Sequence, residues 1–264
     1  MPRRPAALMI GNETAKGLIL LWDNRRTFLP ELTALLVFYF LIQFLVGGGH
    51  LVPALYAPTL IAFGLYAVLY IVTLKMVAGT LEEMNAGTLE QIHLSPLPSW
   101  ALSLGRLAST LIEAGAATVV LGAVLILLLG IHLSHRLDAV VPVLLTLVDV
   151  AGFGLLLGAL AIRVSNIGAI LHVLQSVVVF LNGSFVPVNL YPAWLQFVAA
   201  LLPTTLGVGV TRKMLLQGGS LASAWSDHSL AWLLLHAAVL VALGAVAYQL
   251  AIRRALREGR LGPR

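Results

Sequence analysis

Residues 52–77 read VPALYAPTLIAFGLYAVLYIVTLKMV, an apolar run that contains one charged side chain, Lys75. A helix needs about 20 apolar residues to cross the roughly 30 Å hydrocarbon core of a bilayer, so this run is long enough to span a membrane. The whole chain has the same character, because 59% of its 264 residues are hydrophobic and only 10% are charged. Soluble domains carry about 25% charged residues. We therefore predict an all-α integral membrane protein rather than a soluble enzyme.

Six apolar stretches qualify as transmembrane helices of a single transmembrane domain, which comprises residues 1–264. They lie near residues 31–46, 52–77, 102–129, 139–162, 167–181 and 230–252. The first and the fifth are short for a span and need flanking residues. A further apolar run, at residues 192–202, is too short to cross. We expect it to form a re-entrant or extracellular helical segment between the fifth and sixth spans, within protein or beside a cavity.

The basic residues predict the orientation of the chain. With six spans and both termini inside, only three of the 16 Lys and Arg residues lie outside: Arg136, Arg212 and Lys213. The remaining thirteen lie on the inner side: Arg3, Arg4, Lys16, Arg25, Arg26, Lys75, Arg106, Arg163, Arg253, Arg254, Arg257, Arg260 and Arg264. Such an excess of inner basic residues is typical of plasma-membrane proteins with cytoplasmic termini. The formal charge of +5 therefore reports topology rather than a nucleic-acid partner.

The sequence carries few signs of chemistry on this chain. It contains no cysteine, so disulfide and thiolate chemistry are excluded. It also contains no H-E-x-x-H motif, no metal-spaced His and Asp cluster and no G-x-S-x-G motif, which leaves an intramembrane hydrolase without support. We expect no catalytic, cofactor-binding or metal site.

The longest polar stretch between apolar runs is residues 82–99, EEMNAGTLEQIHLSPLPS, on the cytoplasmic side between the second and third spans. Gly87 ends the helix that continues from the second span. Thr88 can cap a new helix, with Gln91 reaching back as in a capping box. Two prolines then stop that helix within about two turns. The pattern predicts a short helix in the cytosol.

This predicted helix is amphipathic. Leu89 and Ile92 lie three residues apart on one face, and Glu90 and His93 lie on another. A simple return loop does not need a helix that presents Leu and Ile to its surroundings. The alternative is a solvated turn that only returns the chain to the membrane.

The N-terminal segment, residues 8–28, predicts a second amphipathic helix. Leu18 and Trp22 belong to an apolar stripe with helical spacing, and Arg25 and Arg26 lie beside it. We expect this helix at the inner membrane interface, with Trp22 at the level of the headgroups. The alternative is a lipid anchor with no further role.

Four ionisable side chains lie within the predicted spans: Glu113, Asp149, His172 and His236. Charges at membrane depth are costly and normally face protein or water, so each marks a candidate functional position. Arg106 lies two turns before Glu113 on a similar face, and a structural ion pair or a hydrogen-bonded carboxyl is one interpretation. The alternative for both carboxylates is a role in handling protons or a cationic substrate. The histidines are more often packing residues than ligands.

Two segments resemble one family, the ABC-2 type exporter permeases. Residues 87–106, GTLEQIHLSPLPSWALSLGR, are similar to the cytoplasmic segment after the second span of these permeases. Residues 182–218, NGSFVPVNLYPAWLQFVAALLPTTLGVGVTRKMLLQG, are similar to the segment after their fifth span. The resemblance implies that ATP and Mg²⁺ bind to a separate ATPase (nucleotide-binding) subunit, and this chain contains no G-x-x-x-x-G-K-[ST] motif. It also implies a half-transporter that pairs with a second copy, as a homodimer, or with a paralogue.

The same resemblance implies a role for the polar stretch as the element that couples the permease to the ATPase. Leu89 and Ile92 would occupy a groove of the partner, while Glu82, Glu83 and Glu90 would meet basic or polar groups at its rim. Such rim charges mainly steer and align a partner. The coupling residues implied in this way are Glu82, Glu83, Gly87, Thr88, Leu89, Glu90 and Ile92. The N-terminal helix would also lean on the ATPase.

In this family the second and fifth spans line the central pathway between two protomers. By position, Tyr66 and Tyr70 of the second span, with Gln175 and Phe180 of the fifth, are candidates to face it. Tyr66 and Tyr70 lie four residues apart and share a helix face. The alternative is aromatic packing between helices.

Together these features predict the permease subunit of an ATP-binding cassette exporter. We expect it to move an amphiphilic small molecule, drug or lipid-like substrate outward. One alternative is a secondary transporter or channel that works alone, although the sequence has no clear internal repeat of the kind such proteins often carry. Another is a membrane anchor or assembly factor without a transport role.

Overall fold

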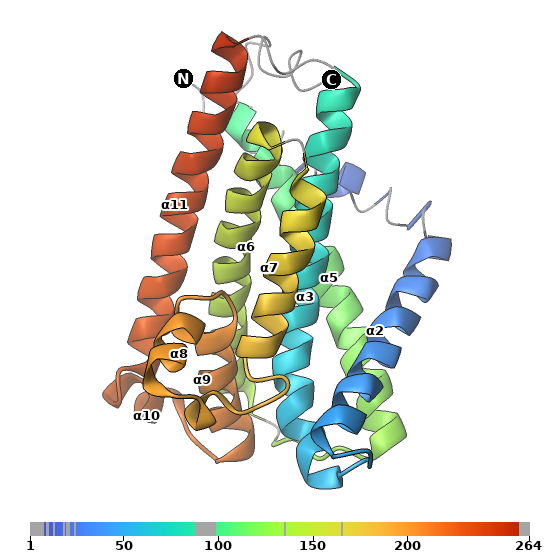
Figure 1. The fold of residues 1–264 in the computed structure, drawn as a ribbon, viewed down its shortest axis with the longest axis vertical. Coiled ribbons are helices and arrows are strands. Elements are labelled where there is room, and N and C mark those ends of the chain that lie inside the picture. Colours follow the sequence, from blue (N-terminus) through green and yellow to red (C-terminus); the bar gives the residue numbers. More distant parts are fainter. Residues whose placement is uncertain are drawn as a thin grey trace.

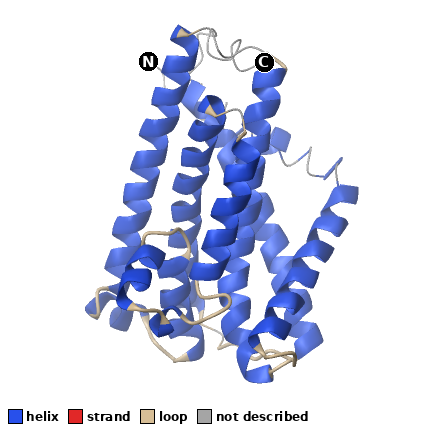
Figure 2. Cartoon of the chain, in the orientation of Figure 1, coloured by secondary structure: helices blue, strands red, loops and turns tan. Residues whose placement is uncertain are grey.

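The computed structural model describes residue 8 and residues 11–12, 14–17, 19, 22–23, 25–87, 99–134, 136–164 and 166–258. All regular secondary structure within these residues is helical, as predicted (Figure 2). Five of the helices are long and apolar enough to cross a membrane. They are α2 (Arg25–Val46), α3 (Pro53–Asn85), α5 (Ser99–Leu129), α6 (Val140–Arg163, preceded by the short helix η1, Leu137–Ala139) and α11 (Ser229–Arg257).

The long helices alternate in direction along the bundle (Figure 1). The fifth predicted span corresponds to α7 (Ile167–Leu181), whose 15 residues are fewer than a straight span needs. Its bounds are those of the predicted stretch, and no flanking residue extends the helix. At the lower end of Figure 1 the chain leaves α7, and at the same end it enters α11. Residues 182–228 therefore begin and end on one side of the bundle.

Between α7 and α11 the chain forms η2 (Val188–Leu190), α8 (Ala193–Ala200), α9 (Thr205–Leu216) and α10 (Leu221–Ser226). The axes of α8 and α9 are bent by 97° across a short break. The apolar run at 192–202, predicted to dip into the membrane, is thus the first arm of a bent helix pair. The second arm, α9, was not predicted, because its sequence mixes apolar residues with glycine, threonine and two basic residues. We call residues 182–228 the hairpin end of the molecule.

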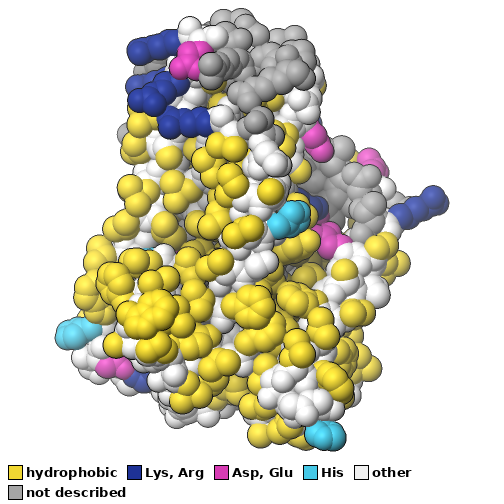
Figure 3. All heavy atoms as spheres, in the orientation of Figure 1, with side chains coloured by type: hydrophobic (Ala, Val, Ile, Leu, Met, Phe, Trp, Pro, Cys, Tyr) yellow, Lys and Arg dark blue, Asp and Glu magenta, His cyan; other side chains and the backbone are white. Residues whose placement is uncertain are grey.

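The core of the bundle is built around α3. Within the most apolar 18 residues of each helix, 78% are buried in α3, against 22% in each of α2, α5 and α11. The outer helices therefore keep much of their apolar surface exposed, and Figure 3 shows hydrophobic side chains over most of the flank of the bundle. This distribution is expected when lipid rather than water surrounds the helices.

Small residues bring α6 and α11 close together. A side chain at Gly152 would overlap the backbone of Leu240 and Val241, and one at Gly244 would overlap the carbonyl of Gly152. Glycine allows close backbone approach, which is how helices in membranes gain packing energy without a hydrophobic driving force. The α6–α11 pair consequently forms a tight unit beside α3.

Helix α2 is attached to α3 mainly near the turn that joins them. The hydroxyl of Tyr39 donates to the carbonyl of Tyr56 (3.0 Å), and Gln43 Nε2 donates to the hydroxyl of Tyr39 (2.9 Å). The rings of Phe38 and Phe63 meet edge to face at 5.6 Å. From this attachment α2 diverges from the bundle towards its first residues (Figure 1).

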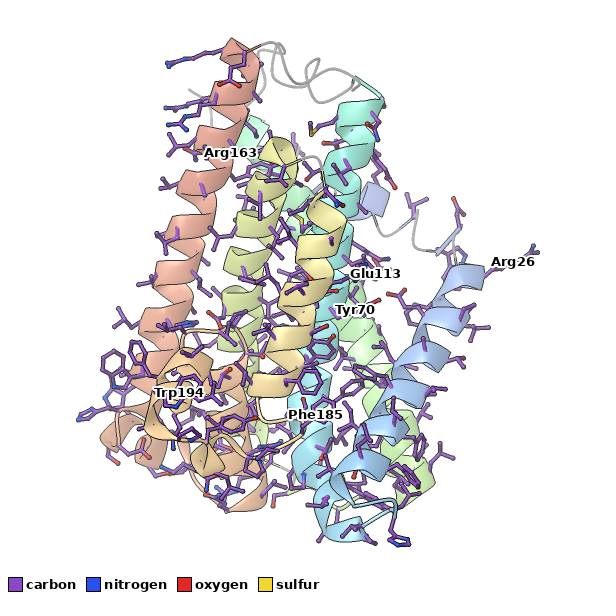
Figure 4. The ribbon with its side chains drawn as sticks, viewed as in Figure 1. Arg26, Tyr70, Glu113, Arg163, Phe185 and Trp194 are labelled. Carbon is purple, nitrogen blue, oxygen red and sulfur yellow. The ribbon has the colours of Figure 1, made fainter. Side chains whose placement is uncertain are left out.

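Charge is distributed unequally between the two ends. Basic side chains gather where α6 and α11 finish, opposite the hairpin end (Figures 3 and 4). We call this the basic end and define it by four residues: Arg163, Arg253, Arg254 and Arg257. The hairpin end contributes two Lys or Arg residues, Arg212 and Lys213.

Candidate functional site

The predicted coupling stretch begins inside a helix rather than in a loop. Helix α3 continues to Asn85, and Gly87 follows in the left-handed region with φ of 67°. Glycine is favoured there because it has no Cβ atom, and this arrangement is common at helix ends. Glu82 and Glu83 therefore occupy the last helical turns of α3, in agreement with the prediction that the helix of the second span continues to Gly87. Residues 88–98 lie outside the described residues, and they include Thr88, Leu89, Glu90 and Ile92.

One of these two acidic residues is paired within the chain. Glu83 forms an ion pair with Arg106 of α5, whereas Glu82 is exposed. The proposed contact of Glu83 with a partner's rim would therefore have to compete with this ion pair. Since α3 enters the 88–98 segment and α5 leaves it, this ion pair joins the two helices at the base of the segment.

The N-terminal segment lies against the same region. Thr14 Oγ1 donates to the carbonyl of Gly105 in α5 (3.3 Å), and Gly17 packs against Ser109. Trp22 is largely exposed, as an interfacial anchor would be. Leu18 lies outside the described residues.

The helix of the first span begins closer to the N-terminus than predicted. Helix α2 begins at Arg25 and contains Pro30, so residues 25–28 belong to the helix of the span. Proline is tolerated near the start of a helix because the first N–H groups have no partner there. The exposed side chain of Arg26 points away from the bundle at this first turn (Figure 4).

Glu113 pairs with a residue that sequence analysis did not consider as its partner. Its carboxylate forms an ion pair with Lys75 of α3, not with Arg106, which is paired with Glu83. Glu31 of α2 is close enough to interact electrostatically with both Lys75 and Glu113. Lys75 and Glu31 both lie inside predicted spans. Their positions in the sequence could therefore have identified them as intramembrane charges.

These three residues, Glu31, Lys75 and Glu113, form what we call the inner ion cluster. It joins α2, α3 and α5, and Glu113 lies in the region between α3 and α2 together with Tyr70 (Figure 4). The side chain of Lys75 is 37% exposed and that of Glu113 is 12% exposed. With two carboxylates and one ammonium group, the ionised cluster has an excess of negative charge.

The four candidates for the translocation path do not share one surface within this chain. Tyr66 is buried, and its ring lies 6.3 Å from that of Phe38 in α2. Gln175 is also buried, and its Nε2 donates to Thr73 Oγ1 of α3 (2.9 Å). Both residues therefore make helix–helix contacts within the chain.

The other two candidates are more accessible. Tyr70 is partly buried beside Tyr66, at 6.2 Å between ring centroids. Phe180 is exposed and stacks on Phe185 at 4.5 Å. It continues an exposed apolar face of α7 that also contains Val173 and Val177.

Asp149 is the centre of a different network, at the hairpin end. Its side chain is only 1% exposed. Oδ1 lies 2.8 Å from Nδ1 of His236 in α11, and Oδ2 accepts from the backbone N–H of Thr204 (3.2 Å). The other ring nitrogen of His236 lies 3.2 Å from the carbonyl of Leu201. Because both nitrogens face acceptors, the doubly protonated imidazolium satisfies this geometry best.

Thr204 is the residue around which α8 and α9 bend. It is buried, and its φ of 75° places it in the left-handed region, which is costly for a β-branched residue. The hydrogen bond from its N–H to Asp149 stabilises this conformation. Asn182 adds a second link, since its Nδ2 donates to the carbonyl of Ala62 in α3 (3.2 Å) and lies 3.4 Å from Thr204 Oγ1.

The turn after α7 is closed by its own hydrogen bonds. Asn182 Oδ1 accepts from both the N–H and the hydroxyl of Ser184, at 3.0 and 2.8 Å. The hydroxyl of Tyr191 donates to the carbonyl of Phe180 (2.6 Å), and burial raises the pKa of Tyr191 above its usual range. The hydroxyl therefore keeps its proton at neutral pH and remains a donor. This turn and the Asp149 network together hold the hairpin end against α3, α6 and α11.

Sequence analysis singled out Asp149 and mentioned His236, but it did not predict that they meet. It missed Thr204 and Asn182, for which the only signal was polar residues within an otherwise apolar segment. In the part of the chain that the structure describes, no group of three or more His, Asp or Glu side chains could hold a metal ion. The candidate site therefore consists of three polar clusters: the Glu83–Arg106 ion pair, the inner ion cluster and the Asp149 network at the hairpin end.

The chain is similar in sequence to known transporter permeases. The family model described as ABC-2 type transporter matches residues 13–216. Two curated relatives, both named probable multidrug ABC transporter permease YbhR, from Escherichia coli K12 and O157:H7, are 27% identical over 200 residues. The alignment covers 75% of this chain and 52% of each relative, so the chain spans about half the length of the curated relatives it matches. Because the family model covers well over half of the chain and includes the 88–98 segment and residues 182–216 of the hairpin end, this protein belongs to the ABC-2 type transporter family.

Proposed function

We propose that this protein is the membrane-spanning permease subunit of an ATP-binding cassette exporter. In this proposal it moves an amphiphilic small molecule, drug or lipid-like substrate outward, while a separate ATPase subunit binds ATP and Mg²⁺. The match to the ABC-2 family over residues 13–216 carries the proposal. The name of the E. coli relatives, probable multidrug permeases, supports a drug-like substrate.

The geometry around the 88–98 segment suggests how an ATPase would act on this chain. A force on the segment reaches α3 at Asn85 and α5 at Ser99. The Glu83–Arg106 ion pair holds these helices together at the base of the segment, and the Lys75–Glu113 pair joins them again further along. The two helices would therefore move as a unit rather than separate when the segment is pushed.

A second permease copy, or a paralogue, is the proposed partner within the membrane. The exposed apolar face of α7, with Val173, Val177 and Phe180, supports this, because the same helix is fixed to α3 by Gln175 on its opposite side. We propose that the complex lies in the cell membrane with the basic end in the cytoplasm. The four arginines of that end favour this orientation.

The test of the proposal is a double variant, Leu89→Ala with Ile92→Ala, in the permease produced together with its ATPase. Full burial of each side chain in a partner's groove contributes about 1.5–3 kcal/mol. A tenfold change in affinity corresponds to about 1.4 kcal/mol. We therefore expect ATPase copurification to weaken by well over tenfold and permease-stimulated ATP hydrolysis to fall with it.

The matched control is Leu127→Ala with Leu128→Ala, which removes two exposed apolar side chains from the opposite end of α5. This control should retain ATPase binding and stimulated hydrolysis. Both variants should still insert in the membrane. Full binding and full stimulation in the Leu89 and Ile92 variant would show that the segment is a return turn. ATP-independent transport would support the alternative of a transporter that works alone.

A further inference from the structure

The hairpin end contains a pocket with a volume of about 560 Å³. It lies between η2, α8 and α9 on one side and the start of α11 on the other. Its apolar wall includes Val188 of η2 and Leu206 of α9, whose side chains are partly exposed. The transport proposal above makes no use of this pocket.

Arg212 brings a positive charge to the pocket lining. Its Nε and Nη2 donate to the carbonyl of Pro58 at 3.0 and 2.6 Å, and Nη2 also donates to the carbonyl of Gly183 (2.7 Å). Among the described residues Arg212 has no carboxylate partner. The acidic residue on the lining, Asp227, is already paired with Lys213.

A partly buried charge normally needs a counter-charge, because carbonyl dipoles compensate only part of the lost hydration. The bonds of Arg212 use Nε and Nη2, so the two N–H groups of Nη1 make no hydrogen bond within the described residues. A guanidinium group is planar and matches the oxygens of phosphate and carboxylate. An anion from outside the chain would supply the counter-charge that Arg212 lacks among the described residues.

The rest of the lining indicates that this anion carries an apolar tail. Asn189 and Gln196 add amide groups to the pocket, while Val188 and Leu206 form its apolar wall. Trp232, in the first turn of α11, also lines the pocket and is 62% exposed. Tryptophan is enriched at the level of lipid headgroups. A free inorganic anion would gain nothing from the apolar wall, whereas a lipid would use both surfaces.

We propose that this pocket binds the anionic headgroup of a phospholipid, with Arg212 as its charge partner and the apolar wall against the start of its acyl chains. The pocket lies at the hairpin end of the bundle, opposite the end at which α3 finishes (Figure 1). The inference does not depend on the substrate or on the ATPase.

A pocket-filling variant tests the proposal without disturbing Arg212. Gly209 lines the pocket, and a Cβ atom added there would meet nothing within 4 Å, so we expect Gly209→Leu to place its side chain in the cavity. The matched control is Gly122→Leu on α5, where a Cβ atom also meets nothing within 4 Å. The second variant, Arg212→Gln, removes the charge, but it also alters the bonds to Pro58 and Gly183.

The measurement is the rise in melting temperature of the purified full-length protein as lipid is added. The probes are dioctanoyl phosphatidylglycerol, dioctanoyl phosphatidylcholine and inorganic phosphate. We expect phosphatidylglycerol to stabilise the unmodified protein and Gly122→Leu at least tenfold more effectively than phosphatidylcholine. Gly209→Leu should require at least tenfold more phosphatidylglycerol, and Arg212→Gln should respond equally to the two lipids.

Three outcomes would overturn the proposal. They are an unchanged phosphatidylglycerol response in Gly209→Leu, no preference for phosphatidylglycerol over phosphatidylcholine in the unmodified protein, and equal stabilisation by inorganic phosphate. If Arg212→Gln does not fold, Gly209→Leu still decides the result. Since no ATPase is present in the assay, a failure of the transport proposal leaves this test unaffected.

Discussion

Asp149 and Glu113 occupy similar positions in the sequence, because each is a carboxylate well inside an apolar helix, yet their surroundings differ. Asp149 is 1% exposed and binds His236 and the backbone N–H of Thr204. Glu113 is 12% exposed and pairs with Lys75, which is 37% exposed. One carboxylate fixes a strained backbone turn, and the other pairs with one long side chain of α3.

This difference separates two kinds of intramembrane charge. The partners of Asp149 are held in position, because one is a backbone N–H group and the other is a short side chain on the tightly packed α11. Lys75 has a long flexible stem that can carry its ammonium group towards water. Loss of Asp149 should therefore damage the fold, whereas loss of Glu113 should change local charge with little effect on the fold.

Asp149→Ala should have the largest effect. It leaves the imidazole of His236 and the N–H of Thr204 without their acceptor, and removing one member of a buried ion pair costs about 3–5 kcal/mol. We expect a clear fall in melting temperature and in yield, measured on purified protein in detergent. Asp149→Asn is the matched variant, because its amide oxygen can still accept one hydrogen bond, and it should lose less. An unchanged melting temperature in Asp149→Ala would contradict the anchoring role.

His236→Leu should have an intermediate effect. Asp149 then keeps only the N–H of Thr204, and a hydrogen bond to a charged group contributes about 1.5–3 kcal/mol. The control is His172→Leu on the exposed side of α7, which should leave the melting temperature almost unchanged. If the two histidine variants behave alike, the contact between His236 and Asp149 does not contribute to stability.

Glu113→Gln should change stability little, because exposed and partly exposed ion pairs contribute about 0–1 kcal/mol. The same is expected of Glu31→Gln. Thermal unfolding and substrate transport should be measured on the same preparations. Reduced transport at unchanged stability would indicate that the inner ion cluster handles protons or a cationic substrate. A stability loss as large as that of Asp149→Ala would remove the distinction between the two carboxylates.

Single-cysteine labelling should have the smallest effect on the protein and should identify the side of the membrane on which each region lies. The native chain has no cysteine. Ala222→Cys in α10 and Ala86→Cys after α3 are matched, because both alanines are exposed and lie at opposite ends of the bundle. We expect an impermeant thiol reagent to label Ala222→Cys from outside intact cells and Ala86→Cys only after permeabilisation. The reverse pattern would invert the proposed topology.

Hydropathy predicted most of the fold, because the length of an apolar run decides whether a helix can cross a bilayer. The predicted stretches at 102–129 and 230–252 lie within observed long helices, and the stretch at 52–77 does so from Pro53 onward. Helices extend past the apolar region that hydropathy detects. Glu82 and Glu83 continue α3 as a regular helix, and the glycine at position 87 was the signal for its end.

Membrane class, helix positions and the family motifs were readable from the sequence alone, since they depend on local composition and spacing. Which charges pair was decided by tertiary structure, because helix packing brings together residues distant in sequence. Lys75 meets Glu113 and Asp149 meets His236 only after α3, α5, α6 and α11 have packed. The left-handed conformation of Thr204 could not be predicted from local propensity either, because that propensity disfavours a left-handed threonine. The conformation is stabilised by a carboxylate 55 residues earlier in the chain.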